Sequence, residues 1–374
     1  MIKIKVDEGF NKFVKIKVIG VGGGGCNAVG RMATTLSGVD LIGINTDIQA
    51  LANCGVPIKI QIGQRITGGL GSGGNPEKGK FAANEDKEQI AKLLKGVNIC
   101  FLTAGLGGGT GTGASPVIAR IAREQGAITV AVVTTPFAIE GAKRMNYAEQ
   151  GLIELKEKVD TFIHIPNEKL FEITDTKTSI LDDFKKIDDI LSQGVSSVVE
   201  LITKSGVINL DFADVKAVME NGGESIMGVG KAKGPERAVN AAKQAITNRL
   251  LEEKDISSAR NILISITGGL DLTLHEVKDA VKTIKNNLSS LSNSVLGVVS
   301  DEKSEDEVKI TVIATGLSEK KEFHPPPQKR VHPRKEKKEP TLFDAAEASI
   351  IDGEDMDTPT FLRKRQKQKK MEEE

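Results

Sequence analysis

Aromatic side chains are scarce in this chain of 374 residues. It contains no Trp and one Tyr, and aromatic residues make up only 3% of it. Proteins that bind single-stranded nucleic acid depend on aromatic stacking, and nucleic-acid binders in general carry a surplus of basic residues. Here 51 Lys and Arg are balanced by 51 Asp and Glu. The composition therefore argues against a nucleic-acid partner.

Cysteine and histidine are also few. The three Cys residues, Cys26, Cys54 and Cys100, never stand in CxxC spacing, and the four His are scattered. This excludes a disulfide framework and a structural zinc site. No apolar run approaches the roughly 20 residues of a membrane-spanning helix, and the N-terminus lacks the apolar core of a signal peptide. We therefore expect a cytoplasmic protein.

Glycine, by contrast, is abundant, with 39 residues. From about residue 14 to 165, short apolar runs alternate with amphipathic stretches, a pattern that predicts an α/β fold with a parallel sheet covered on both faces. The expected strands are 15–21, 40–45, 57–62, 96–104, 128–134 and 160–165. The expected helices are 27–36, 76–94, 115–125 and 141–158.

A long helical pattern and a second α/β unit follow this region. Helical spacing of apolar residues predicts one long helix over 178–204. The second unit has expected strands 224–230, 261–267, 294–300 and 307–314, and expected helices 235–251 and 274–288. From about Ser318 the chain becomes rich in Pro and charge and poor in large apolar residues, which is typical of a disordered tail.

The predicted organisation has six parts. They are an N-terminal extension (1–13), a first α/β domain (14–177), a central helix (178–204), a smaller α/β domain (205–317), a flexible linker (318–352) and a C-terminal segment (353–374).

The first expected strand leads directly into a glycine loop. Gly20, Gly22 and Gly25 fit G-x-G-x-x-G between a strand and a helix. Without Cβ atoms, backbone N–H groups can face a phosphate at the helix N-terminus. A tight turn with no ligand remains an alternative. A dinucleotide such as NAD is another, because Asp40 lies near the distance expected of a ribose-binding acid.

Two further glycine-rich stretches favour a chain of phosphates over one pyrophosphate. Gly105–Gly113 follows the fourth strand, opens a helix and adds the hydroxyls of Thr110 and Thr112. Gly68–Pro76 precedes another helix. The G-x-x-x-x-G-K pattern at 74–80 is not a P-loop, because Phe81 replaces the Ser or Thr that binds Mg²⁺ and no strand leads into it. We expect the third stretch to close over the terminal phosphate.

Taken together, seven segments resemble the FtsZ family of the tubulin superfamily, in the same order. They are Gly22–Ala28, Asn45–Asp47, Gly71–Pro76, Gly107–Gly113, Pro136–Arg144, Ile165–Lys169 and Asn209–Val215. The resemblance covers about residues 14–317. It implies a Rossmann-like parallel-sheet GTPase domain, a long central helix and a smaller α/β domain. It also implies a protein that hydrolyses GTP and polymerises head to tail into the cytokinetic ring of dividing bacteria.

The resemblance also assigns a set of residues to GTP or GDP, accompanied by Mg²⁺. They are Gly22, Gly23, Gly24, Gly25, Cys26, Asn27, Asp47, Gly73, Gly74, Asn75, Gly107, Gly108, Gly109, Thr110, Gly111, Thr112, Gly113, Glu140, Arg144, Asn167 and Asp188. The two glycine loops contact phosphates, Glu140 binds the ribose and Arg144 lies near the sugar and phosphate. The carboxylate of Asp188 accepts hydrogen bonds from N1–H and the exocyclic amine of guanine, which adenine cannot supply.

Three polar residues after the long helix are candidates for catalysis. Asn209, Asp211 and Asp214 form a polar cluster, and the residues alone favour a helix cap at Asp211 with a solvated Asp214. The resemblance implies that this loop enters the nucleotide site of the next subunit, where the carboxylates polarise the attacking water. GTP hydrolysis would then be activated by assembly.

The tail carries two candidate binding segments. Asp355–Lys364 resembles the peptide with which the family docks on membrane-anchoring and regulatory division proteins, and the basic run Arg363–Lys370 is suited to anionic lipid. These features predict a location at mid-cell, beneath the inner membrane. For most of the tail, a merely tolerated extension is an equally simple interpretation.

Two other function classes compete with a polymerising GTPase. A dinucleotide-dependent oxidoreductase is supported only by the first glycine loop and explains neither Gly107–Gly113 nor the carboxylates at Asp211 and Asp214. A nucleotide-binding regulator of the same superfamily that does not polymerise is the other, and the presence of Asn209, both carboxylates and the tail peptide argues against it.

Overall fold

The computed structural model describes most of the chain up to residue 317 and short pieces after it. The described residues are 14–34, 36–170, 180–203, 206–247, 256–287, 292–301, 304, 306–317, 350–351, 354–355, 359–360, 362 and 364. The chain divides into two compact units, Met1–Lys320 and Lys321–Glu374. Most of the segments predicted to be the extension (1–13), the linker (318–352) and the basic run (363–370) lie outside the described residues.

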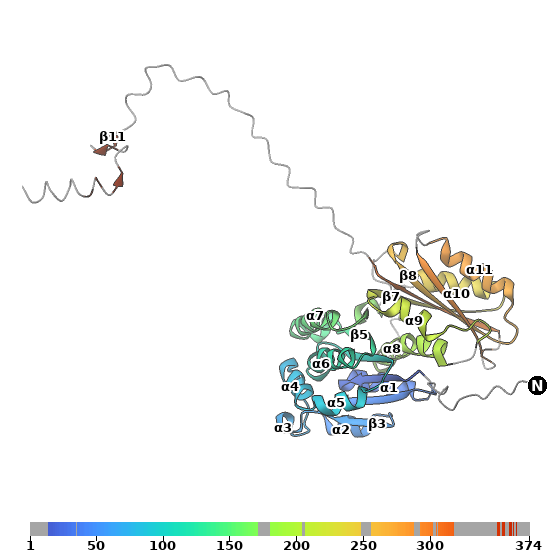
Figure 1. Ribbon diagram of the computed structural model, residues 1–374, viewed down its shortest axis with the longest axis horizontal. Helices are drawn as coiled ribbons and strands as arrows, with labels where there is room; N and C mark the ends of the chain where they lie inside the picture. Colours follow the sequence, from blue (N-terminus) through green and yellow to red (C-terminus); the bar gives the residue numbers. More distant parts are fainter. Residues whose placement is uncertain are drawn as a thin grey trace, which may run out of the picture. The chain divides into compact units, whose positions relative to one another are not determined.

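One sheet of ten strands runs through the described part of the first unit, in the order β3-β2-β1-β4-β5-β6-β7-β10-β8-β9 (Figure 1). The strands are β1 (Ile16–Val21), β2 (Asp40–Asn45), β3 (Ile58–Gln61), β4 (Ile99–Gly105), β5 (Ile128–Thr135), β6 (Thr161–Pro166), β7 (Gly223–Lys233), β8 (Asn261–Gly268), β9 (Asn293–Ser300) and β10 (Glu307–Thr315). Every neighbouring pair is parallel except those of β10, which runs antiparallel to β7 and to β8. The predicted α/β fold with a mostly parallel sheet is therefore confirmed.

Helices lie between most consecutive strands of the large sheet. The α-helices are α1 (Gly22–Met32), α2 (Ile48–Asn53), α3 (Gln64–Thr67), α4 (Pro76–Glu85), α5 (Lys87–Leu94), α6 (Thr110–Glu124), α7 (Ala142–Lys156), α8 (Ile180–Thr203), α9 (Phe212–Met219), α10 (Arg237–Thr247) and α11 (Leu274–Lys285). Short 3-10 helices lie at η2 (Ala138–Glu140), η3 (Asn167–Leu170) and η4 (Ile256–Ser258). In the second unit, β11 (Ile350–Ile351) pairs with β12 (Glu354–Asp355). Among the described residues, no helix combines the length and apolarity that a membrane crossing needs.

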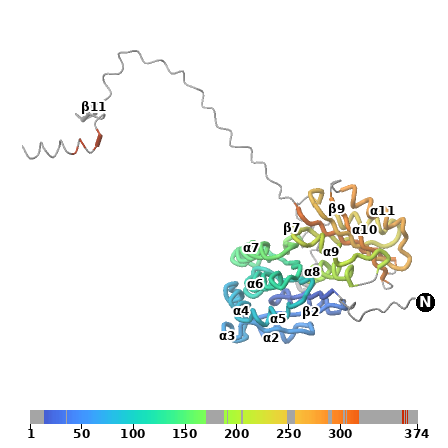
Figure 2. Tube along the Cα trace, viewed as in Figure 1, coloured from blue at the N-terminus to red at the C-terminus, as the bar shows by residue number. Residues whose placement is uncertain are grey.

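The first six strands are covered on both faces, as a buried parallel sheet requires. On one face, α1, α8 and α9 pack on side chains such as Val18 and Phe101. On the other face, α4, α5, α6 and α7 pack on their neighbours Ile19 and Leu102. Because side chains alternate along a strand, consecutive residues enter opposite layers. Figure 2 shows α4 to α7 gathered on one side of the chain trace.

A third apolar layer covers β7 to β10. In Figure 1, α10 and α11 lie next to each other on these strands. Their buried faces carry small residues, including Ala241, Ala242 and Ala280, against Ile264 and Ile310 of the sheet. Small side chains let α10 approach β7 so closely that a Cβ on Gly228 or Gly230 would strike its backbone. These glycines are therefore required by packing.

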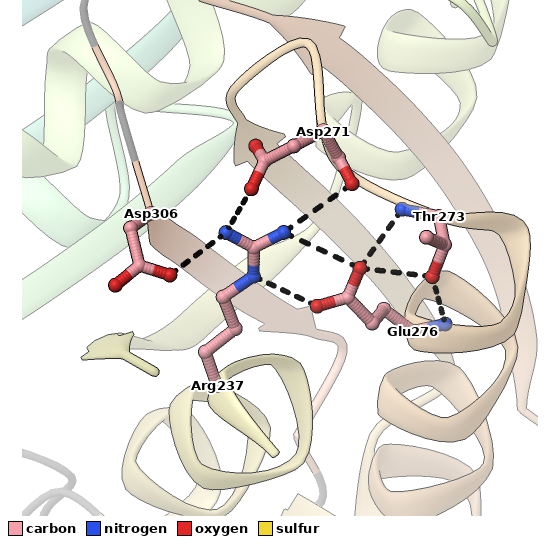
Figure 3. A network of polar contacts seen from close by, with 5 residues as sticks. All are labelled: Arg237, Asp271, Thr273, Glu276 and Asp306. Carbon is pink, nitrogen blue, oxygen red and sulfur yellow. Dashed lines mark hydrogen bonds and ion pairs between the residues drawn. The ribbon is translucent and has the colours of Figure 1, made fainter. Parts of the chain in front are cut away.

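One buried guanidinium ties the loops of this third layer together (Figure 3). Arg237 begins α10 and is 5% exposed. It contacts carboxylate oxygens of Asp271 at 2.6 Å, Glu276 at 2.7 Å and Asp306 at 3.4 Å. Glu276 also accepts hydrogen bonds from the backbone N–H and hydroxyl of Thr273, which caps α11. The pairing with Arg237 lowers the pKa of Glu276 to about 2.

Two predicted helix starts were wrong. α1 begins at Gly22 and α6 at Thr110, each five residues before the predicted start. Glycine has low helix propensity, but here tertiary packing overrides it. A Cβ on Gly25 would strike the carbonyl of Thr103, and one on Gly111 would lie 2.6 Å from the carbonyl oxygen of Gly105. The glycines let both helices cross closely over β4.

The helix predicted over 76–94 is two helices. α4 ends at Glu85 and α5 starts at Lys87. Between them, the carboxylate of Asp86 accepts a hydrogen bond of 2.7 Å from the backbone N–H of Gly63. This contact holds Asp86 outside helical geometry and anchors the turn before α3.

Candidate functional site

The two glycine loops meet at the carboxyl ends of neighbouring strands. β1 and β4 pair in parallel, from Ile16–Ile99 to Val21–Ala104. The first loop therefore leaves the sheet beside the second. Gly22 has φ +71°, and a Cβ there would lie 2.8 Å from the backbone nitrogen of Gly111. Backbone contact this close places the N-termini of α1 and α6 side by side.

Both helices present unsatisfied N–H groups at this point. Neither Val21 before α1 nor Gly109 before α6 makes a side-chain capping bond, and neither helix has an acidic residue in its first turn. By contrast, Asp47 caps α2 and Asn75 caps α4. Uncapped N-termini carry partial positive charge and attract anions. The sequence thus leaves two helix ends open to a phosphate chain.

Some of the glycines leave space that the protein does not fill. A Cβ on Gly23 or Gly108 would meet no atom within 4 Å, and neither residue has a positive φ. Their lack of a side chain is therefore not required by packing or by backbone geometry. It keeps the backbone approachable from the cavity, as the close approach of a phosphate requires.

Three buried hydroxyls meet at the start of α6, which Thr110 begins. The hydroxyl of Thr110 lies 2.6 Å from that of Thr46 and 3.1 Å from that of Ser72. All three residues are at least nine-tenths buried. A Cβ on Gly109 would strike the Ser72 hydroxyl. The third glycine stretch is therefore joined directly to the second.

Other side chains that line the cavity are suited to a sugar and a base. Glu140 pairs with Arg144 and accepts a hydrogen bond of 3.0 Å from the backbone N–H of Phe137. Asn167 is 6% exposed, and among the described residues its amide oxygen has no hydrogen-bond partner. A buried acceptor without a partner is costly in a finished fold. Asn167 therefore favours a ligand that donates to it.

Asp188 adds a carboxylate to the cavity wall. Its side chain is 14% exposed, and one oxygen lies 3.2 Å from Nε of Arg31. Burial raises the pKa of Asp188 to about 6. The charge of Arg31 lowers this pKa in part, and the charge of neighbouring Asp189 raises it. A carboxylate that is poorly solvated gains most from donors that a ligand supplies.

These groups line one cavity of about 640 Å³. Of the residues predicted to bind the nucleotide, the structure places these on its wall: Gly22, Gly23, Gly24, Asn27, Asp47, Gly73, Gly74, Gly108, Gly109, Thr110, Gly111, Glu140, Arg144, Asn167 and Asp188. The volume lies in the range of small-molecule sites.

Six predicted residues do not line the cavity: Gly25, Cys26, Asn75, Gly107, Thr112 and Gly113. Each holds the loops in shape. Gly25 and Gly113 give room for neighbouring backbone, and Asn75 caps α4. The hydroxyl of Thr112 accepts a hydrogen bond of 2.9 Å from the N–H of Gly107. Cys26 is buried on the other side of α1, where its thiol contacts backbone carbonyls.

Eleven lining residues were not among the predicted ones: Asn45, Thr46, Ala50, Leu70, Gly71, Ser72, Gly105, Leu106, Thr134, Pro136 and Leu191. Most lie within a few residues of a predicted residue in the same loop. Leu191 stands one helical turn after Asp188, so helical spacing could have indicated it. Thr134, the last residue but one of β5, pairs with Gly105 of β4, which only the strand register reveals.

The three candidate catalytic residues lie outside this cavity. Asn209 and Asp211 are exposed in the segment between α8 and α9, and Asp214 is in the first turn of α9. Asp211 caps the helix: its carboxylate accepts from the N–H of Asp214 at 2.8 Å, and that of Asp214 accepts from the N–H of Asp211 at 3.2 Å. The helix-cap interpretation thus describes the geometry within one chain.

The comparisons with known proteins agree with this architecture. The GTPase-domain model of the Tubulin/FtsZ family matches residues 15–175, and the FtsZ C-terminal domain model matches 223–318. The chain is similar to a point mutant of M. jannaschii FtsZ, with 44% identity over 81% of this chain and 91% of that chain, at a TM-score of 0.78.

An empty FtsZ dimer of M. jannaschii is similar at the same identity and TM-score over 81% of this chain and 88% of that chain. CetZ1 of Haloferax volcanii, a GDP-bound monomer, shares the fold at 20% identity and a TM-score of 0.70, over 82% of this chain and 95% of that chain. The chain belongs to the FtsZ family of tubulin-like GTPases.

Proposed function

We propose that the chain hydrolyses GTP between two copies, one supplying the nucleotide cavity and the next supplying Asp211 and Asp214. The observation that carries this proposal is the separation of the two parts within one chain. Asp188 lines the cavity, and α8 continues for 15 residues beyond it to Thr203. At about 1.5 Å per residue this is roughly 22 Å. The carboxylates follow the far end of the helix.

Within the cavity, the chain's own groups bind and orient the nucleotide. The open N-termini of α1 and α6 hold the phosphates, and the Thr110 hydroxyl donates to the terminal one. Glu140 and Asn167 bind the ribose side. Asp188 accepts from the two N–H donors of guanine, which selects GTP over ATP.

A Mg²⁺ ion bound with the nucleotide would spread the charge of the phosphates. The described residues contain no cluster of three or more His, Cys, Asp or Glu that could hold a metal. The oxygen-rich phosphate end, with Thr110 and Ser72, fits Mg²⁺ held mainly by phosphate and water, which is its usual mode at nucleotides.

Hydrogen bonds within one chain hold the proposed catalytic loop, from Gly206 to Asp214, in place before it meets a partner. The side chain of Asn209 accepts a hydrogen bond of 2.5 Å from the N–H of Gly206, and Val207 donates 2.8 Å to the carbonyl of Val298 in β9. The capping box then fixes Asp211 and Asp214 at the surface. Preorganised carboxylates can orient water for in-line attack on a phosphate of the neighbouring copy.

Exposed apolar side chains accompany both halves of the proposed site. Leu70 lines the cavity and is 85% exposed, while Val207, beside the catalytic loop, is 78% exposed. Two different surfaces that meet in this way form an open, head-to-tail contact and hence a filament. Solved relatives include an FtsZ dimer and a GTPγS-bound CetZ2 protofilament, the latter sharing only the fold at 22% identity.

The first test is GTP hydrolysis as a function of protein concentration with Mg²⁺. The rate per chain should be near zero below a threshold and rise above it, because a lone copy lacks a complete site. A constant rate per chain down to high dilution would contradict the shared site.

The second test is complementation between two inactive variants. Asp211→Ala retains the cavity but lacks a catalytic carboxylate, whereas Asp188→Ala retains the catalytic loop but loses guanine binding. Each alone should be inactive. An equal mixture should recover activity, up to about a quarter of wild type, because one contact in four pairs a good cavity with a good loop. No recovery in mixed polymers would contradict the proposal.

We further propose that the filaments form the scaffold of the bacterial division ring, beneath the inner membrane. The support is membership of the FtsZ family together with the tail segment Asp355–Lys364. Phe361 and Leu362 give that segment apolar anchors for a groove on membrane-anchoring or regulatory division proteins. The basic run Arg363–Lys370 would add attraction to anionic lipid.

A further inference from the structure

A pair of cysteines lies directly behind the first glycine loop. Cys26 is in α1, and Cys54 ends α2. A Cβ on Gly43 of β2 would lie 3.3 Å from Sγ of Cys26 and 3.4 Å from Sγ of Cys54. The thiol of Cys54 also donates a hydrogen bond of 3.1 Å to the backbone carbonyl of Cys26. Both sulfur atoms therefore lie close to the backbone of Gly43.

The pair opens into a second cavity, of about 890 Å³, which both cysteines line. This cavity shares Asn27 and Asp188 with the nucleotide cavity, so the two spaces adjoin across α1 and α8. Cys54 is 6% exposed and Cys26 2%. A reagent small enough to enter the second cavity can therefore approach the sulfur atoms without passing through the nucleotide.

We propose that Cys26 and Cys54 form a modification site, a dithiol that small-molecule disulfides convert reversibly into an internal disulfide that weakens nucleotide binding. The Cys54 thiol loses its proton to water, and the resulting thiolate attacks one sulfur of the reagent, from which one reagent thiolate leaves. The Cys26 thiol then loses its proton to water, attacks Sγ of Cys54 and expels the second reagent thiolate. The two cysteines lose two electrons, and the reagent becomes two thiols.

The surroundings favour this product over a bound metal or a stable thiolate. Burial and the neighbouring Cys54 raise the pKa of Cys26. A neutral disulfide therefore suits this environment better than a charged sulfur. The same burial explains the order of the two steps, in which the more exposed Cys54 reacts first.

The disulfide would join two helices whose N-terminal ends border the nucleotide. α1 carries Gly22–Gly24, and α2 is capped by Asp47, all of which line the nucleotide cavity. Disulfide formation requires the two sulfur atoms to move together to about 2.05 Å. The start of α1 is packed too closely to shift toward the sheet, because a Cβ on Gly20 would strike the carbonyl of Gly25 and one on Gly25 would strike that of Thr103. The glycine loop must move instead.

Reciprocity gives a second expected effect. If oxidation weakens nucleotide binding by some factor, saturating nucleotide must disfavour the disulfide by the same factor. The coupling rests on the proposed nucleotide cavity, whereas the disulfide itself does not. Measuring the two separately keeps their failures distinguishable.

The experiment uses the reduced full-length chain and 5,5′-dithiobis(2-nitrobenzoate). We expect two thiolates released per chain, no retained adduct, and a peptide linking Cys26 to Cys54 that is lighter by two hydrogens. The Kd for a fluorescent GDP analogue should rise at least about fivefold, the lower end of typical couplings, and return with dithiothreitol. Saturating GDP should shift the thiol–disulfide equilibrium of the pair toward the dithiol by the same factor.

Two matched variants test whether the rise in Kd comes from the Cys26–Cys54 pair. Cys54→Ser should bind the GDP analogue normally and resist the change. Cys100→Ser should behave as wild type, because Cys100 is fully buried in β4 and burial raises its pKa to about 12. A retained adduct or no linked peptide in the native wild-type chain would overturn the site. A linked peptide with unchanged Kd would overturn the coupling.

Discussion

At the scale of single residues, Asp188 shows how a binding group is held ready. Burial raises its pKa to about 6, although Arg31 lies 3.2 Å away. Guanine donors would compensate for the solvation that the fold withholds. The free protein therefore keeps a carboxylate whose charge becomes favourable only with the ligand.

This predicts a pH-dependent affinity. Guanine binding requires the ionised carboxylate, so the affinity for GDP should rise with pH up to about 6 and level off above it. Below pH 6 the loss should approach tenfold per unit. Calorimetric titration of wild type and Asp188→Asn checks this. Because the nucleotide phosphates titrate in both proteins, only the difference between the two slopes reports on Asp188, and equal slopes would contradict the assignment.

Asp188 should also lower stability. A folded pKa above the ordinary value near 4 means that stability is lost as pH rises from about 4 to about 6. At pH 7, Asp188→Asn should raise the free energy of unfolding of the nucleotide-free protein by about 1–3 kcal/mol, following from a shift of roughly two units. In this variant Arg31 still has an ion-pair partner, because the carboxylate of Asp189 lies 3.4 Å from it. Urea unfolding measures the change, and a less stable variant would show that the Arg31 pair dominates.

Substitutions at the neighbouring glycines Gly107 and Gly108 should separate an effect on nucleotide binding from an effect on folding. Gly108→Ala adds a methyl group that meets no protein atom, whereas Gly107 has φ +95° and lies against the carbonyl of Arg144. We expect Gly108→Ala to change stability by less than about 0.5 kcal/mol yet weaken GDP binding. Gly107→Ala should destabilise the fold by at least about 1 kcal/mol. Thermal melts with and without GDP test both, and a destabilised Gly108→Ala would contradict a cavity kept open for ligand.

At the scale of elements, periodicity predicted the strands well because each buried strand is a continuous apolar run. It placed β2 at its observed bounds, Asp40–Asn45. It failed at the starts of α1 and α6, where the helix is formed by glycines that local propensity disfavours. Close packing on β4 decides those residues, and the sequence of a loop does not reveal which strand lies beneath it.

The same limit applies to the site. Sequence motifs predicted the glycine loops and the candidate side chains. They did not predict the contact among the hydroxyls of Thr46, Ser72 and Thr110, which joins three separate loops. Likewise, the two thiols of Cys26 and Cys54 are 28 residues apart in sequence. Such groups meet only through sheet order, which the spacing of motifs does not encode.

The Arg237 network is an element-scale device that links α10, α11 and the turn before β10. Arg237→Ala should destabilise the chain by about 2–4 kcal/mol at pH 7, because three carboxylates would face one another without a cation. Since the pKa of Glu276 is lowered to about 2, its contribution is present above pH 4.5 and is lost toward pH 2. The wild-type advantage should therefore shrink at pH 3 in urea unfolding. An equal advantage at both pH values would exclude these ion pairs as its source.

At the scale of the whole molecule, the folded core and the tail are separate units, Met1–Lys320 and Lys321–Glu374. The nucleotide cavity, the catalytic loop and the Cys26–Cys54 pair all belong to the first. The proposed assembly-dependent hydrolysis would therefore need only the first unit, which leaves the tail for the other partners that we propose.

A chain ending at Asp352 should thus hydrolyse GTP with the same threshold concentration as the full chain, and it should sediment as polymer with GTP but not with GDP. The reason is that truncation removes neither half of the shared site. The loss should appear elsewhere, in binding to vesicles of anionic lipid, because the truncation removes the basic run Arg363–Lys370. Full-length chain with Arg363, Lys364 and Arg365 changed to Gln is the matched control. If the truncated chain lost hydrolysis while the control kept it, the tail would be part of the assembly interface and the separation of the two units would be wrong.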